Sequence, residues 1–438
     1  MSLNLIELND TAVRVTRDGV VVCISPGIAL VDDRGVCCGA AAQTRAQLQP
    51  RDVYQHFWQQ LNEVPLPDAR RHCRHHADLA YHHLASVLDA AGRPREAVLV
   101  VPGHYDDRQL ALLLGIAQAL DLKVEALVDS SVAMTAGCAP AGRYTVVEMH
   151  RHHISLSTVQ VGAEVARLAW TDIEQAGFAR FEAAAVDLVA AALLSQAHFD
   201  ALHDAGSAQL LHDHLPRWLA QANQSSEVTI SVDYHGRRFG ARLMSRDFVH
   251  VTSMVLASVA DALIADTTLL VHAALAALPG ALDQLAPARA LPTDACYRAI
   301  ATHRPALAST KSGVSYVTQL PATRAPLFEN DVQTAAGLAR SPARRAPNHI
   351  LAGHAAHALG PSPLYLHADG RIAASASGPS CAIAVQNEQV VLRANGIEAH
   401  INGVPAAAAS VVRAGDHITL AGGRALFVPI IVSASRAP

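Results

Sequence analysis

Histidine is unusually frequent in this sequence, with 24 among 438 residues, and two of these histidines have a spacing that could bind a metal ion. His72 and His76 are four residues apart, and at this spacing two side chains on one helix face can ligate zinc. Arg70, Arg71 and Arg74 surround the pair. Because neighbouring cations repel a metal ion, the pattern favours a solvated helix face, and we predict no metal site.

A second cluster lies at Glu148-Met149-His150-Arg151-His152-His153, where three imidazoles and one guanidinium stand together. Imidazoles titrate near neutral pH. Arg and His side chains also donate hydrogen bonds to anions such as phosphate. One interpretation of this cluster is therefore an anion pocket.

Two other polar pairs have structural interpretations. Cys37 and Cys38 could form a redox pair, but consecutive side chains of a strand point to opposite faces, so one is expected to be a small buried residue. Asp106 and Asp107 precede a helical pattern, where an aspartate first serves as an N-cap. The sequence contains no catalytic-triad order, Walker loop, dinucleotide fingerprint or zinc-finger spacing.

The composition bounds the class of protein. Hydrophobic residues make up 51% of the chain and aromatic residues only 4%, so we expect a folded core of Ala, Val, Leu and Ile. The formal net charge of −4 provides no basic excess for nucleic acid. Seven cysteines without a C-x-x-C pair indicate reduced thiols and a cytoplasmic protein. The most apolar stretch, 253–278, contains Asp261, Asp266 and His272, which argues against a membrane span.

The length predicts two to four domains, and the hydrophobic periodicity predicts the elements that position these residues. A β-meander is expected first, then two helical stretches, and then an alternation of strands and helices that is typical of an α/β unit. The expected meander strands are Leu3–Leu8, Ala12–Thr16 and Val20–Ser25. The two helical stretches are 51–61 and 68–91. The alternating elements are a strand at Ala97–Pro102, a helix at Asp107–Leu120, a strand at Val124–Val128, a helix at Ser131–Ala139, a hairpin at Tyr144–Val161, helical pattern at Phe178–Asn223, a hairpin at Val228–Met244 and a strand at Thr268–Val271.

Proline marks the boundary of the C-terminal part. Five prolines between residues 304 and 347, with the string Ser341-Pro-Ala-Arg-Arg-Ala-Pro347, predict a linker over 304–347. Short strands separated by Asn, Gly and Asp turns follow, so residues 348–438 are expected to form an all-β module.

Several strings in residues 1–303 resemble the nucleotide-binding domain of DnaK-type heat-shock chaperones, in the actin-like ATPase superfamily. They are Pro26–Arg34 with the following Gly39-Ala-Ala-Ala-Gln43, Ala97–Gln109 with its Val-Val-Pro-Gly-His-Tyr core, and Met244-Ser-Arg-Asp-Phe248. The resemblance implies an α/β, two-lobed actin-like ATPase fold built from ribonuclease H-like repeats.

The resemblance also implies where a nucleotide would lie. In that family two Gly-rich hairpin loops hold the phosphates and carboxylates hold Mg²⁺ through water. Here the first loop reads Glu7-Leu8-Asn9-Asp10-Thr11 and the second reads Glu148 to His153. Large side chains of His150, Arg151 and His152 replace glycines that would let the backbone approach a phosphate.

The remaining nucleotide positions depart from the family as well. The lysine that orients water corresponds to Gln43, a second-lobe glutamate corresponds to Ser130, and the Gly-Gly run of the adenosine loop corresponds to His272-Ala273. We therefore predict a degenerate cleft, no cofactor and a pseudo-ATPase. The open alternative is a divergent ATPase or chaperone that binds ATP or ADP with Mg²⁺ through altered phosphate loops.

The C-terminal strands resemble a forkhead-associated domain, which implies a small β-sandwich. The strings that carry this resemblance are Ile401-Asn-Gly-Val404 and Val412–Leu420. The family's phosphothreonine-reading Arg and His are missing near Gly378–Ala382, although Arg371 or Arg393 could substitute. We expect a scaffold or regulatory protein that binds protein partners through this module and the cleft. A filament-forming actin relative is the third hypothesis.

Overall fold

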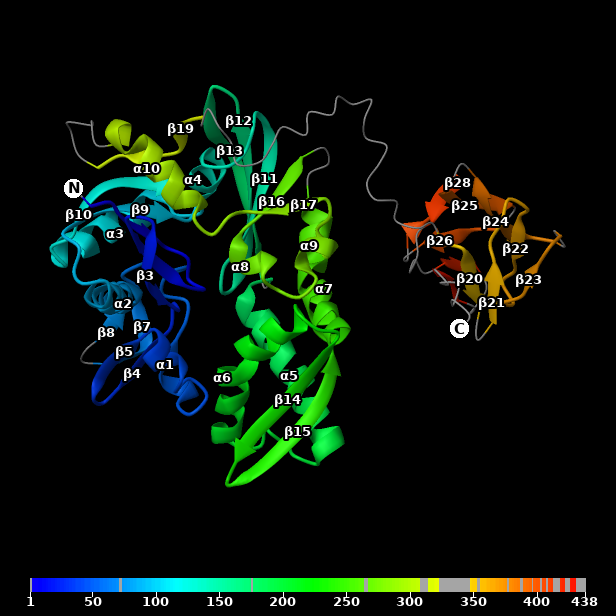
Figure 1. The fold of residues 1–438 in the computed structure, drawn as a ribbon, viewed down its shortest axis with the longest axis horizontal. Coiled ribbons are helices and arrows are strands. Elements are labelled where there is room, and N and C mark those ends of the chain that lie inside the picture. The colour runs from blue at the N-terminus through cyan, green and yellow to red at the C-terminus, as the bar shows by residue number, and fades with distance from the viewer. Residues whose placement is uncertain are drawn as a thin grey trace. The chain divides into compact units, whose positions relative to one another are not determined.

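The computed structural model of the chain, drawn in Figure 1, describes residues 2–70, 73–174, 176–263, 267–307, 314–322, 347–352, 355–375, 378–386, 389–395, 397–401, 404–406, 409–412, 418–421 and 426–430. The fold is mixed α/β, as the sequence predicted. It divides into two units, Met1–Asn330 and Asp331–Pro438.

Two six-stranded sheets that share the order of five strands form the centre of unit Met1–Asn330, and the sixth strand lies at a different edge in each. In each, three consecutive strands form an antiparallel meander, and two later strands continue in parallel from the other side of the first strand. The first sheet has the order β18 (Tyr316–Val317), β10 (Lys123–Asp129), β9 (Glu96–Val101), β1 (Asn4–Glu7), β2 (Val13–Arg17) and β3 (Val20–Ser25). The second has the order β17 (Ala288–Ala290), β16 (Thr268–Val271), β11 (Gly142–Met149), β12 (His153–Val161), β13 (Glu164–Glu174) and β19 (Gln319–Pro321).

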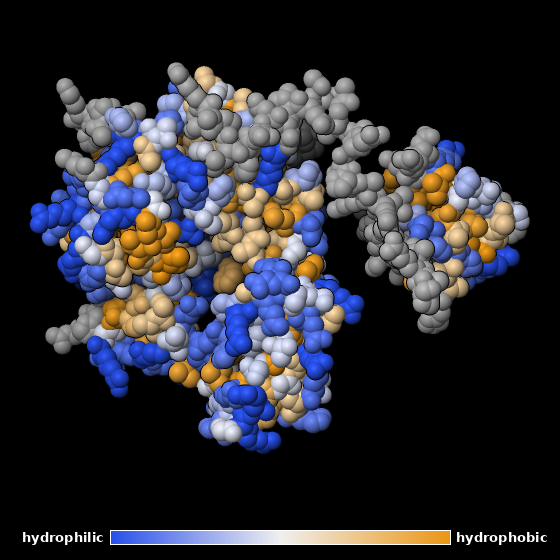
Figure 2. Space-filling model, in the orientation of Figure 1, coloured by the Kyte–Doolittle hydropathy of each residue, from blue (hydrophilic) through white to orange (hydrophobic). Residues whose placement is uncertain are grey.

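The central strands are apolar because both faces of the sheets are covered. Val98, Leu99 and Val101 of β9 are fully buried. The helices α4 (Ser130–Ala136) and α10 (Ala295–Leu307) contribute to one core with residues of both sheets. This shared core holds the two sheets together. In contrast, the edge strand β3 exposes Val20 and Ile24, and Figure 2 shows scattered apolar areas on this face of the unit.

Helices and small sheets extend from each central sheet. On the first sheet's side these elements are β4 (Ala29–Asp32), β5 (Gly35–Cys38), α1 (Ala40–Gln43), the 3₁₀ turn η1 (Pro50–Asp52), β6 (Val53–Tyr54), β7 (Pro65–Arg70), β8 (Cys73–His75), α2 (His76–Ala90) and α3 (Asp107–Ala119). On the second sheet's side they are α5 (Phe178–Ala197), α6 (Ala205–Ala222), β14 (Glu227–Tyr234), β15 (Arg237–Met244), α7 (Ser245–Ala262), α8 (Ala273–Ala276) and α9 (Ala281–Gln284). Within the described part of the chain, no helix is both long enough and apolar enough to cross a membrane.

Local signals explain several helix boundaries. Asp106 caps α3 by accepting a hydrogen bond from the Gln109 backbone N–H at 2.8 Å, as its sequence position predicted. The helical pattern over 178–223 is divided between α5 and α6, because His198 adopts a left-handed backbone and Asp204 caps a new helix.

Both helices predicted between residues 51 and 91 differ from the structure. Residues 51–61 form η1, β6 and turns, and their periodic side chains Phe57 and Leu61 are buried without a helix. The second helix begins only at His76, because the Asp78 carboxylate accepts the backbone N–H groups of Arg74 and His75. Residues 73–75 form the strand β8, and His72, the predicted partner of His76, lies outside the described residues.

The predicted linker begins within ordered structure. Helix α10 continues to Leu307, and β18 and β19 pair with β10 and β13 of the two central sheets. Residues 308–313 and 323–346 of the predicted linker, which include Ser341–Arg345, lie outside the described residues.

Unit Asp331–Pro438 contains two antiparallel sheets. One has the order β21 (Ala355–Ala358), β20 (His349–Ala352), β30 (Leu426–Ile430), β29 (Ile418–Leu420), β26 (Ala399–Ile401) and β27 (Val404–Pro405). The other has the order β23 (Ile372–Ala373), β22 (Leu364–Leu366), β24 (Ser380–Gln386), β25 (Gln389–Asn395) and β28 (Ala409–Val412). Ile350, Ile383 and Phe427 belong to their common core. Asn402-Gly403 and Gly415-Asp416, which belong to the strings that resemble a forkhead-associated domain, lie outside the described residues.

The buried ring of His83 should make the free energy of unfolding depend on pH. Its ring is fully buried, accepts the Trp58 indole N–H at Nδ1 and therefore donates from Nε2 to Ser25 Oγ, both at 2.8 Å. Burial lowers the pKa of His83 from 6.5 to about 4, so the unfolded chain binds this proton more tightly than the folded chain. The His83 contribution to stability is complete above pH 6.5 and is lost as the pH falls towards 4, by about 3 kcal/mol.

Urea unfolding of the wild type and of His83→Gln between pH 7 and pH 4 measures this contribution. The variant lacks the titrating ring, so the wild type should lose its stability advantage on acidification. Parallel pH profiles of the two proteins would contradict the expectation.

Candidate functional site

The two turns that correspond to phosphate loops in the resemblance lie against each other in the structure. One connects β1 to β2 and contains Asn9 and Asp10, and the other connects β11 to β12. Asn9 Nδ2 donates to the Met149 carbonyl at 3.1 Å, and the Arg151 backbone N–H donates to Asp10 Oδ1 at 2.6 Å. The two turns therefore meet, although they are separated by about 140 residues.

Arg151 does not face an open anion pocket. Its side chain is buried, and its guanidinium donates to Glu182 Oε2 of α5 at 3.0 Å and to Gln55 Oε1 at 2.7 Å. Burial by itself would raise the pKa of Glu182, but His212 and Arg151 lower it. The charge of Arg151 is thus already balanced within the protein.

The carboxylates predicted beside the nucleotide also bind protein groups. Glu148 accepts hydrogen bonds from Ser130 Oγ at 2.8 Å and Asn9 Nδ2 at 3.3 Å. Burial is the main cause that raises the pKa of Glu7 to about 7, with Glu148 adding repulsion. These residues and His272 line a cavity of about 50 Å³.

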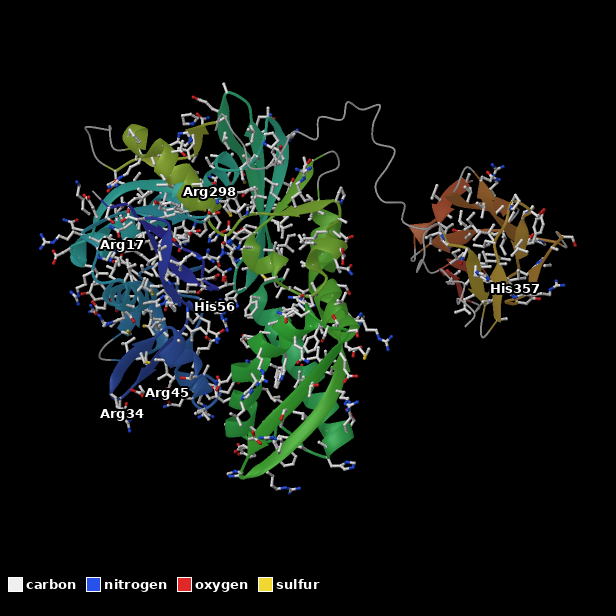
Figure 3. All side chains as sticks on the ribbon, in the orientation of Figure 1. Arg17, Arg34, Arg45, His56, Arg298 and His357 are labelled. Carbon is white, nitrogen blue, oxygen red and sulfur yellow. The ribbon has the colours of Figure 1, made fainter. Side chains whose placement is uncertain are left out.

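Other predicted residues are dispersed around this pair of turns. Thr11 donates to Asn9 Oδ1, whereas the Gln43 carbonyl accepts from Gln209 of α6. His272 precedes α8, whose first residue is Ala273. His152 stacks on His56, labelled in Figure 3, with ring centroids 3.6 Å apart. The two stacked rings line an open depression of about 420 Å³ whose lining includes neither Asp10 nor Glu148.

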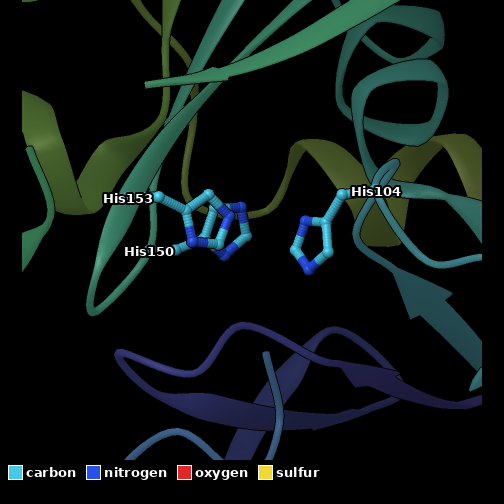
Figure 4. Close-up of side chains that lie close together, drawn as sticks. All are labelled: His104, His150 and His153. Atoms are coloured by element: carbon cyan, nitrogen blue, oxygen red, sulfur yellow. The ribbon is translucent and has the colours of Figure 1, made fainter. Parts of the chain in front are cut away.

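Three histidines converge beside the Asp10 turn, as Figure 4 shows. His104 follows β9, and His150 and His153 stand at the two sides of the β11–β12 turn. One ring nitrogen of each lies within 4.8 Å of the other two. The rings of His150 and His153 are stacked with centroids 4.4 Å apart, and each residue is 1% exposed.

Most of the polar atoms in this cluster lack a partner in the described structure. Both ring nitrogens of His104 and of His153, Nε2 of His150 and Oδ2 of Asp10 are buried without a hydrogen bond. Asp10 Oδ1 lies 3.7 Å from His150 Nδ1, and Asp172 Oδ1 lies 3.8 Å from His153 Nε2. Such a concentration of unpaired buried groups is costly and requires an explanation.

The electrostatics of the cluster keep two of the rings neutral. Burial lowers the pKa of His104 to about 2 and that of His153 to about 3, and repulsion from His150 adds to both shifts. Burial opposes the charge of Asp10 as well, but the His150 contact lowers its pKa to about 2. Burial would also lower the pKa of His150, yet the carboxylates of Asp10, Glu148 and Asp172 raise it. Neutral imidazoles with free lone pairs beside an ionised carboxylate can accept a cation.

The sequence analysis did not select His104, Asp172 or Glu182. The position of His104 at the carboxyl end of a central parallel strand was the available signal, because such strand ends gather ligands in α/β folds. No sequence signal pointed to Asp172 or Glu182, since the partners of these two residues are defined only by sheet register and helix packing.

In unit Asp331–Pro438, both arginines that could substitute for the missing phosphothreonine-binding residues are placed beside other side chains. Arg371 Nε lies 3.7 Å from Asp369 Oδ2, and Arg393 donates to Gln386 Oε1 at 3.0 Å. Comparison of the chain with protein-family models and with curated proteins found no match.

Proposed function

We propose that this chain is a non-catalytic, DnaK-like and actin-like pseudo-ATPase that works as a scaffold or regulatory protein. The observation that carries the proposal is the volume left at the predicted nucleotide position. The cavity beside Glu7, Glu148 and His272 measures about 50 Å³, and the one beside Asp10 and His150 about 10 Å³. Ligand pockets typically measure about 300–1,000 Å³.

The strand order supports the proposed two-lobed fold. A fold of ribonuclease H-like repeats requires the same topology twice, and the two central sheets have the same order of meander and parallel strands. The hairpin turns that face each other occupy equivalent positions, between the first and second strand of each sheet.

Protein side chains occupy the place of phosphate-binding groups. The backbone N–H of Arg151, which a glycine-rich loop would offer to a phosphate, donates to Asp10 instead. The Asp10 carboxylate already accepts the hydrogen bond of this N–H. A polyanion at this position would therefore meet an N–H that is already bonded and the negative charge of Asp10.

The C-terminal unit supplies the proposed contact with protein partners. Its two antiparallel sheets are consistent with a forkhead-associated-like sandwich. The placement of Arg371 and Arg393 beside Asp369 and Gln386 favours a partner that is not recognised through a phosphate.

Titration calorimetry and thermal unfolding with Mg·ATP and Mg·ADP test the proposal. We expect no binding heat, no increase in melting temperature and no hydrolysis above background. A nucleotide at 100 times its dissociation constant would stabilise the folded chain by about 2.7 kcal/mol. Clear stabilisation by Mg·ATP would favour the alternative, a divergent ATP-binding relative.

A variant with the second turn opened provides a control. Changing His150, Arg151 and His152 to glycine removes the side chains at the phosphate position, but Gln43, Ser130 and Asp10 remain. Because catalytic groups act as a unit, we expect a less stable protein without turnover. Turnover in this triple variant would contradict the proposal.

A further inference from the structure

We propose that His104, His150 and His153 form a binding site for one divalent transition-metal ion of the Zn²⁺ class. The three rings come from two different sheets of unit Met1–Asn330 and present nitrogens within 4.8 Å of one another (Figure 4). The site lies beside the predicted phosphate position, but its chemistry is independent of nucleotide.

The unpaired nitrogens are the main argument. His150 and His153 are each 1% exposed and retain nitrogens without hydrogen-bond partners. Leaving such groups unpaired costs free energy, whereas a bound metal ion accepts their lone pairs. All three rings have at least one ring nitrogen without a hydrogen-bond partner, so a single ion bound among them would give each ring a partner.

A small cavity lies against two of the three rings, those of His104 and His150. The cavity lined by His104, His150, Asp10 and Tyr105 measures about 10 Å³. That is about the smallest space that can hold one water molecule, and it is too small for a phosphate group. A single metal ion therefore fits where a polyatomic anion does not.

The ligand type selects the metal. Imidazole nitrogens suit Zn²⁺ and related late transition metals, whereas Mg²⁺ and Ca²⁺ prefer oxygen ligands. Zn–N bonds of about 2.0–2.1 Å place tetrahedral ligand atoms roughly 3.4 Å apart. The observed separation of at most 4.8 Å therefore requires only a small rotation of the side chains.

Carboxylates lie beside two of the three rings. Asp10 Oδ1 lies 3.7 Å from Nδ1 of His150, which leaves Nε2 to ligate, and Asp172 lies 3.8 Å from Nε2 of His153. Carboxylates in this position orient histidine ligands and increase their basicity. They also offset the positive charge of the ion.

The consequence for the protein is a metal-dependent link between the two sheets. His104 follows β9 of the first sheet, while His150 and His153 belong to the β11–β12 hairpin of the second. An ion bound by all three stabilises the arrangement in which the two turns meet. The melting temperature should therefore rise with free Zn²⁺.

The test uses the full chain without a histidine tag, stripped of metal by chelator and free of nucleotide. Zn²⁺ is titrated in competition with a chromophoric chelator, and the melting temperature is followed in parallel. We expect one tight site in the wild type and a loss of affinity of about 100-fold or more in His104→Ala and in His153→Ala, since even flanking residues contribute about 10- to 100-fold. Asp10→Asn should weaken binding by about 10- to 100-fold.

His303→Ala is the matched control, because His303 is also a buried histidine with an unpaired nitrogen but belongs to α10. It should retain the tight site and the zinc-dependent increase in melting temperature. A wild type that binds Zn²⁺ no more tightly than the His104→Ala, His153→Ala double variant would overturn the proposal and assign the cavity to water.

Circular dichroism verifies that the variants fold. If they do not, the Co²⁺ form of the wild type decides, because four-coordinate Co²⁺ absorbs visible light much more strongly than hydrated six-coordinate Co²⁺. The weak hydrated spectrum at one equivalent of Co²⁺ would overturn the proposal. Since no nucleotide is present, this result is distinct from any failure of the pseudo-ATPase proposal.

Discussion

Replacing Arg151 by methionine should lower the free energy of unfolding by about 3–5 kcal/mol, because it leaves a buried carboxylate without its main cation. Arg151 and Glu182 are 4% and 7% exposed, and their charged groups are 3.0 Å apart. Among the described residues, His212, 3.5 Å away, is then the remaining group that can offset the charge of Glu182. Gln55 also loses its hydrogen bond to the guanidinium.

Urea unfolding in the presence of chelator measures this effect without any metal contribution. The double variant Arg151→Met, Glu182→Leu is the matched control, since it removes both charges together. It should be more stable than Arg151→Met alone, which gives a favourable coupling energy in the double-mutant cycle. Equal stability of Arg151→Met and the wild type would show that the pair contributes nothing to the fold.

Replacing Asp129 by alanine should be comparably destabilising, by about 3–5 kcal/mol, because Asp129 is fully buried and satisfies four donors. Oδ1 accepts the Val132 backbone N–H at 3.2 Å and the Ser131 hydroxyl at 2.5 Å, which begins α4. Oδ2 accepts Arg167 Nη1 of β13 at 2.6 Å and the Tyr316 hydroxyl at 3.0 Å. The alanine variant removes a helix cap and leaves an arginine between the sheets without its carboxylate.

Asp106→Ala is the control that separates these two contributions. Asp106 caps α3 in the same way but is exposed and pairs with no cation among the residues described. Its loss should cost only about 1 kcal/mol. If urea unfolding gave equal losses for the two alanine variants, capping alone would explain Asp129 and the inter-sheet pair would be unimportant.

Much of the secondary structure follows from local sequence. The three strands predicted for the first meander, Leu3–Leu8, Ala12–Thr16 and Val20–Ser25, overlap β1, β2 and β3 of the structure. The apolar run that became β9 and the cap at Asp106 are similarly local. Local reasoning failed at residues 51–61, because the periodic burial of Phe57 and Leu61 arises from turns that pack into the core.

For the candidate site as well, some features follow from the local sequence and others only from the tertiary structure. The sequence by itself determined the chemistry of the two turns, since loss of glycine and gain of His and Arg are visible in the residues of 7–11 and 148–153. Only the tertiary structure decided that Arg151 faces Glu182 and that His104 meets His150 and His153. These contacts depend on how two sheets pack through a shared core, and residues that are 31 to 49 positions apart carry no local signal of such packing.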